Sequence, residues 1–186
     1  MVAVPRTRRP AGSAIGVFST GDDAVPALDL LRVAGFPGDE VAVLGKGVRR
    51  TNQTQGWIAS GPDAGPFGDW GSLWRALAGW LDPGFAWLPG IGWVTAAGWL
   101  TRTLAAGATL AALADLAVPQ GELVGYVGDV KADRYLVVVR GDAASVARAR
   151  AMLESAAPIR VSVWPPVSGP ASEKAEALGL RDGLAS

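Results

Sequence analysis

The sequence of 186 residues contains no histidine and no cysteine. Without histidine the chain lacks the commonest general base and the commonest zinc ligand, and Ser–His–Asp or Cys–His catalysis is excluded. Without cysteine it has neither disulfides nor thiolate metal sites, which suits a reducing compartment. These absences favour a protein that is not an enzyme and that needs no cofactor or metal.

Charge is also scarce. Only 18% of the residues are charged, and the 17 basic residues are balanced by 17 acidic ones, so no net positive field attracts nucleic acid. The N-terminal stretch has basic residues but no apolar segment or cleavage signal of a secretory peptide. We therefore expect a cytoplasmic protein with no nucleic-acid partner. Association with a membrane surface stays open as an alternative.

The two ends of the chain have similar patterns. A β-type run, a helix with an Asp-rich start and a second β-type run follow one another in Ser13–Gly47, and the same order recurs in Arg134–Trp164. Asp22 and Asp23 are expected to cap the first helix, and Asp142 the second. Two strand–helix–strand units predict an α+β, ferredoxin-like domain with a four-stranded antiparallel sheet and both helices on one face.

The domain is predicted to span residues 13–164, between a disordered Pro/Arg-rich arm at 1–12 and a tail at 165–186. Residues 48–133 interrupt it between the second and third strands, and so long an insertion must have structure of its own. We expect a helical insertion rich in Trp, Ala and Gly. Its expected parts are a polar loop at 49–71, a helix from Ser72 to Pro83, a turn at Leu88–Gly92, a long helix at Trp93–Ala114 and a helix at 120–133.

The long helix would measure about 33 Å, which is close to the thickness of a bilayer's hydrocarbon core. Arg102 near its middle and the many Ala, Gly and Thr residues argue against a membrane span. We expect Arg102 to pair with Asp82 or Asp115 as a structural contact.

The insertion also holds most of the eight tryptophans. So many indoles exceed the need of one small core, and several are expected at a boundary with another subunit, a partner protein or lipid headgroups. The candidate interaction residues are Phe67, Trp70, Trp74, Trp80, Trp87, Trp93 and Trp99.

A second, weaker candidate is an anion site. Lys46, Arg49 and Arg50 stand beside two glycines at the end of the second predicted strand. The Walker pattern is absent and no helix begins directly after these residues, so a solvated strand end is the simpler interpretation.

Three stretches resemble the bacterial general-stress-protein family with the heat-induced, YflT-like domain. They are "AIGVFSTGDDAVPALDLLRVAGFPGDEVAVLGKG", "LPGIGWVTAAGWLTRTLAAGATLAALADLAVP" and "YLVVVRGDAASVARARAMLESAAP", and the resemblance covers Ala14–Trp164. The abundant tryptophans and the loop at 49–71 depart from the family pattern. The resemblance implies a role in stress responses, no established enzymatic activity and no catalytic residues.

The sequence thus predicts a non-enzymatic, stress-associated interaction protein that self-associates or docks on a larger assembly through its apolar insertion. Two alternatives remain open. One is a peripheral membrane protein that places the Trp-rich insertion in the lipid interface. The other is a small-molecule sensor, by analogy with other ferredoxin-like sheets.

Overall fold

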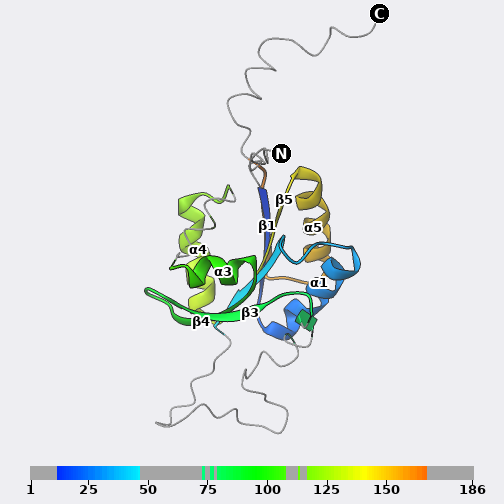
Figure 1. Ribbon diagram of the computed structural model, residues 1–186. Helices are drawn as coiled ribbons and strands as arrows, with labels where there is room; N and C mark the ends of the chain where they lie inside the picture. Colours follow the sequence, from blue (N-terminus) through cyan, green and yellow to red (C-terminus); the bar gives the residue numbers. More distant parts are fainter. Residues whose placement is uncertain are drawn as a thin grey trace, which may run out of the picture.

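In the described part of the chain, a six-stranded antiparallel sheet organises the α+β fold (Figure 1). The computed structural model describes residues 12–46, 73, 76–77, 79–107, 113 and 117–166. The strands are β1 (Gly12–Phe18), β2 (Val41–Gly45), β3 (Pro83–Leu88), β4 (Gly92–Gly98), β5 (Tyr135–Gly141) and β6 (Arg160–Trp164), in the order β3-β4-β2-β5-β1-β6. The helices with described bounds are α1 (Gly21–Val33), α3 (Trp99–Ala105), α4 (Gln120–Lys131) and α5 (Ala143–Ser155).

The two sequence-distant strand–helix–strand units share one sheet, as predicted. β5 lies between β2 and β1, with Val41 opposite Val139 on one side and Ile15 opposite Val138 on the other. β6 pairs with the free side of β1. The four strands predicted from the sequence are therefore adjacent, and every pairing among them is antiparallel.

The prediction of a four-stranded sheet with a purely helical insertion is wrong. The insertion adds a β-hairpin, β3–β4, whose second strand pairs with the outer side of β2. A long helix was expected at Trp93–Ala114, but its first part, Trp93–Gly98, belongs to β4. Its Ala-rich composition suggested a helix, but alternate residues face opposite sides of the sheet, with Val94 and Ala96 in one core and Ala97 in the other.

Helices cover both faces of the sheet. α1 and α5 pack on one face, as predicted, through Leu28, Leu31 and Leu153 among others. α3 and α4 from the insertion pack on the opposite face through Leu100, Leu104 and Tyr126 (Figure 1). Because β5 is covered on both sides, its successive residues alternate between the two cores and read as a continuous apolar run.

Local signals explain the helix boundaries. Thr20, rather than Asp22 or Asp23, is the N-cap of α1, because its hydroxyl accepts from the backbone N–H of Asp23 while the Asp23 carboxylate accepts from the N–H of Thr20. Gly35 follows the helix with a φ of 80°, a left-handed conformation that glycine adopts without strain at the end of a helix. The predicted cap Asp142 is confirmed, since its carboxylate accepts from the N–H of Ser145 at 2.8 Å.

Within the residues described, none of the helices combines the length and the apolarity needed to cross a bilayer. The strand β1 begins at Gly12, which was predicted as the end of the N-terminal arm. The rest of that arm, residues 1–11, lies outside the described residues, as do residues 167–186 of the predicted tail and the polar loop at 49–71.

Candidate functional site

The hairpin β3–β4 is formed by the segment "FAWLPGIGWVTA". Leu88 accepts a hydrogen bond from the N–H of Ile91 at 3.1 Å, which closes a four-residue turn with Pro89 second and Gly90 third. Gly90 has a φ of 76°, and this combination is typical of a type II turn. The turn predicted at Leu88–Gly92 is thus confirmed, but it joins two strands where a turn between helices was expected.

Two tryptophans project from this hairpin. Trp87 and Trp93 stand opposite each other on β3 and β4, and their rings meet edge to face with centroids 5.7 Å apart. They remain 60% and 59% exposed. Their strand neighbours Ala86 and Val94 belong to the core under α3 and α4, so the indoles lie on the opposite face of the sheet. We call Trp87 and Trp93 the tryptophan pair.

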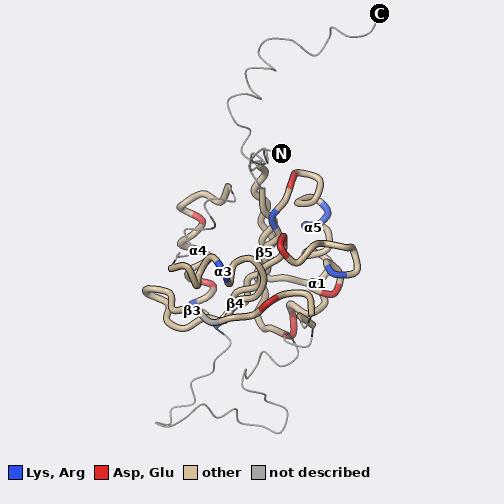
Figure 2. Tube along the Cα trace, in the orientation of Figure 1, with Lys and Arg blue, Asp and Glu red and all other residues tan. Residues whose placement is uncertain are grey.

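The chain segment that carries the tryptophan pair contains no charged residue. No Asp, Glu, Lys or Arg occurs between Asp82 and Arg102, and the hairpin is accordingly tan along its length in Figure 2. Asp82, just before β3, and Arg102, within α3, flank this uncharged segment. They form an ion pair with an N–O distance of 3.9 Å. The pairing of Arg102 with Asp82 agrees with one predicted alternative, but both side chains are exposed, so it contributes little to stability.

Two other predicted interaction residues have internal contacts. The indole N–H of Trp80 donates to the carbonyl of Phe36 at 3.2 Å, and the ring packs against the core under α1 and α5. Trp99 lies beneath the guanidinium of Arg140, 4.8 Å from the ring centroid. Both rings are half-buried, so they help to hold the fold. Phe67, Trp70 and Trp74 lie outside the described residues.

The candidate anion site is described only at Lys46. Its ammonium donates to the carbonyl of Lys131 at the end of α4, 3.0 Å away, and lies 3.7 Å from the carboxylate of Asp133. These contacts neutralise the C-terminal end of a helix, which is a structural use of the charge. Arg49 and Arg50 lie outside the described residues, so an anion site stays a prediction.

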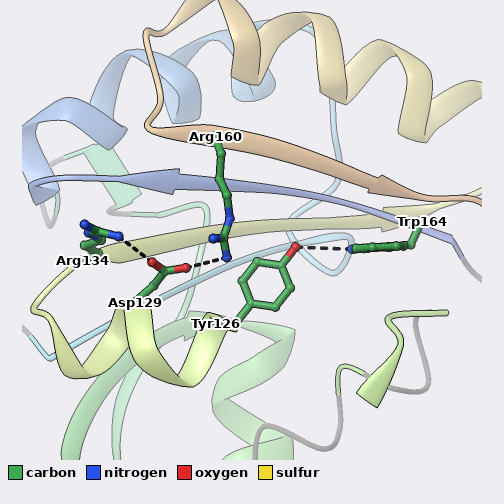
Figure 3. A network of polar contacts seen from close by, with 5 residues as sticks. All are labelled: Tyr126, Asp129, Arg134, Arg160 and Trp164. Carbon is green, nitrogen blue, oxygen red and sulfur yellow. Dashed lines mark hydrogen bonds and ion pairs between the residues drawn. The ribbon is translucent and has the colours of Figure 1, made fainter. Parts of the chain in front are cut away.

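Sequence reasoning missed a polar network beneath α4 (Figure 3). Asp129 is only 4% exposed, yet its two carboxylate oxygens accept from Arg134 at 2.8 Å and from Arg160 at 2.6 Å. Arg160 also lies 5.1 Å from the ring centroid of Tyr126. The Tyr126 hydroxyl in turn accepts from the indole N–H of Trp164 at 3.3 Å. We call these five residues the Asp129 network.

The Asp129 network joins α4 to the last strand. Arg160 and Trp164 are the two ends of β6, whereas Tyr126 and Asp129 lie one turn apart on α4 (Figure 3). A buried carboxylate with two guanidinium partners is fully paired, which indicates a structural fastening. The sequence contains a signal for it in the i, i+3 spacing of Tyr126 and Asp129, but nothing there identifies the partners. Among the described residues, no group of three acidic side chains could hold a metal ion.

Two carboxyl groups next to strand ends have altered pKa values, Glu40 before β2 and Asp142 after β5. Burial raises the pKa of Glu40 above its ordinary value, and repulsion from Asp39 and Asp142 adds to the effect. Hydrogen bonds from Ser145 lower the pKa of Asp142, as expected of a helix cap. Both shifts follow from structural contacts on the α1 and α5 side of the molecule.

Among the described residues, fold and site define an α+β protein with a distinctive exposed feature, an uncharged hairpin that carries two indoles in edge-to-face contact. No family model, curated protein or solved structure matches this chain. The resemblance to the general-stress-protein family therefore stays a prediction.

Proposed function

We propose that this chain is a non-enzymatic interaction protein that docks on another protein surface through the tryptophan pair. One observation carries the proposal: Trp87 and Trp93 are held edge to face on a rigid hairpin, yet more than half of each side chain remains in water. The absence of histidine and cysteine from the whole sequence supports a role without catalysis.

The tryptophan pair has the physical properties of an interface centre. A fully buried aromatic side chain removes about 150–250 Å² of surface from water, and Trp is among the residues that dominate binding energies at interfaces. Because each indole already packs against the other and is carried by a paired strand, little side-chain entropy remains to be lost on binding. The lack of charge at 83–101 removes the cost of desolvating ions.

Two finer proposals accompany this one. The sheet order β2-β5-β1-β6 with α1 and α5 on one face supports a ferredoxin-like core to which the hairpin and its helices were added. The resemblance described above supports an association with stress responses. A stress-induced protein of this kind would act by binding to another protein through its exposed aromatic hairpin.

Photo-cross-linking tests the docking proposal directly. A photoreactive aromatic amino acid is placed at position 93 and, as a matched control, at position 124, where Val124 is 73% exposed on α4. Irradiation in the producing cells is followed by mass spectrometry of the adducts. We expect protein adducts, either with another protein or with a second copy, at position 93 at least tenfold above position 124.

Two results would contradict the proposal. Equal protein adducts at both positions would mean that the hairpin is ordinary surface. Adducts with phospholipid at position 93, in place of protein, would instead favour the alternative in which the indoles lie in the lipid interface.

A further inference from the structure

The outer side of β3 presents backbone groups for another strand. β3 is the last strand of the sheet in the described part of the chain. The N–H of Gly98 donates to the carbonyl of Asp82 at 3.0 Å, and the register continues from there with Pro83 opposite Ala97. In an antiparallel pair, hydrogen-bonded and non-hydrogen-bonded positions alternate. Gly84, Ala86 and Leu88 therefore face β4, whereas the N–H and C=O groups of Phe85 and Trp87 point outward.

The opposite edge of the sheet has protective features that β3 lacks. β6 begins with the charged Arg160 and is followed by Pro165 and Pro166, which have no N–H to donate. Charged residues and proline are the usual devices that prevent strand addition at an edge. β3 has no charge, and its proline is the first residue, Pro83, so the N–H groups of Phe85 and Trp87 are retained.

We propose that β3 pairs with β3 of a second copy of this chain, antiparallel and about a two-fold axis at Ala86. This inference rests on the proposed function, because it names the docking partner of the same hairpin. The two sheets then continue into each other across the axis, and the contact is isologous, so it closes as a dimer.

The spacing of the outward-facing groups fits this axis. The axis places Ala86 opposite Ala86 of the second copy. Phe85 of each copy then lies opposite Trp87 of the other, and each of these two pairs exchanges two N–H···O=C bonds. A two-fold axis at the neighbouring position Phe85 is less suitable. It would align Trp87 of one copy with Pro83 of the other, and Pro83 has no N–H to donate. Ala86 occupies a close, non-hydrogen-bonded position on the axis, where a small side chain suits a Cα separation of about 4.5 Å.

The charge pattern favours a second copy as the occupant. Self-pairing lays the same short strand beside a second copy of itself, so a net charge in the strand would be repelled by the same net charge in the second copy. The uncharged segment at 83–101 avoids this repulsion completely. A strand of six residues provides a small contact, and we therefore expect a dimer with a dissociation constant on the order of micromolar.

Sedimentation velocity of the full chain between about 1 and 100 µM measures the dimer. Phe85→Pro removes an outward N–H and leaves the hydrogen bonds to β4 in place, while Phe85→Val retains the N–H as the matched control. We expect Phe85→Pro to weaken dimerisation at least about 30-fold, since two symmetry-related hydrogen bonds are lost. Phe85→Val should stay within about threefold of the unchanged chain.

A cross-link tests the axis independently of proline's effect on folding. Because the chain has no cysteine, Ala86→Cys introduces a single thiol, and the proposed axis places the two thiols of a dimer within disulfide distance. We expect mild oxidation to convert most of this variant to a covalent dimer. Val124→Cys, at a more exposed position, should remain mostly monomeric under the same conditions.

Each outcome decides the proposal. A chain that is monomeric at about 100 µM overturns it, as does a dimer that survives Phe85→Pro or forms no Ala86→Cys cross-link. If Phe85→Pro fails to fold, the Ala86→Cys result alone decides. A monomer that still gives photo-adducts with other proteins at position 93 refutes the self-pairing but leaves the docking function intact.

Discussion

The two edges of the sheet are stabilised in different ways. In addition to its backbone pairing with β1, β6 is held by side chains: Asp129 and Tyr126 from α4 reach across to Arg160 and Trp164. β3 is held by backbone geometry, through a tight turn at one end and the bond between Gly98 and Asp82 at the other. The comparison shows that, in the described part of the chain, side chains fasten one edge of the sheet and backbone hydrogen bonds define the other.

The largest expected loss of stability comes from a substitution at Gly98, next to the β3 edge of the sheet. Gly98 has a φ of 80°, and a Cβ there would overlap the carbonyl oxygen of Val41. Gly98→Ala should therefore lower the free energy of unfolding by about 3 kcal/mol or more, measured by urea titration. Gly90→Ala is the matched control, because it has a similar φ but no atom within 4 Å of the added Cβ. It should cost only about 1 kcal/mol, and equal losses would refute the role of close packing at Gly98.

The next effect breaks the β6 side. Asp129→Asn leaves Arg134 and Arg160 without their carboxylate and should lower the free energy of unfolding by about 2 kcal/mol. The estimate lies below that for a fully buried pair because both guanidinium groups are partly in water. Asp133→Asn, which removes the exposed partner of Lys46, should cost less than about 0.5 kcal/mol. Hydrogen exchange should show faster opening of β6 in the first variant only.

A third experiment sharpens the comparison at the tryptophan pair. Trp87→Ser, Trp93→Ser and the double variant form a thermodynamic cycle, and we expect a coupling energy of about 0.5–1 kcal/mol from the edge-to-face contact. The free energies of unfolding come from guanidinium titration monitored by far-UV circular dichroism. Zero coupling would mean that the two rings do not support each other in solution.

The smallest effect serves as a reference, because Glu40 belongs to neither edge. Its pKa is raised above 4.5, so the folded state binds this proton more tightly and its ionisation costs stability as the pH rises through that range. Glu40→Gln should thus stabilise the protein at pH 7 by less than about 0.5 kcal/mol after solvent screening, and change nothing below about pH 4. Thermal unfolding at both pH values measures this, and destabilisation at pH 7 would contradict the cause given for the shift.

The sequence was a good guide where local patterns and pairing agree. β1, β2, β5 and β6, together with α1, α4 and α5, were predicted near their observed bounds because apolar periodicity and capping residues define them. β4 was missed because Ala96 and Ala97 favour a helix when only composition is considered. The signal that could have identified it was local: Trp87, Leu88 and then Trp93, Val94 flank a Pro-Gly turn, which is a hairpin pattern.

The candidate site was only partly predictable. The sequence indicated that some tryptophans lie at a boundary, but only tertiary structure separates the exposed Trp87 and Trp93 from the half-buried Trp80 and Trp99. The partners in the Asp129 network were unpredictable, because Asp129 and Arg160 are 31 residues apart and no periodicity connects them.

The strand order has a consequence for how this chain is made. In the described part of the chain, β1 pairs only with β5 and β6, although it precedes the other described strands in the sequence. It must wait for Tyr135 and the residues after it before any neighbour is available, and meanwhile β2, β3 and β4 can already assemble beside each other. A nascent chain therefore carries the apolar strand β1 unpaired until β5 has been synthesised, and during this interval a chaperone would be most useful to it.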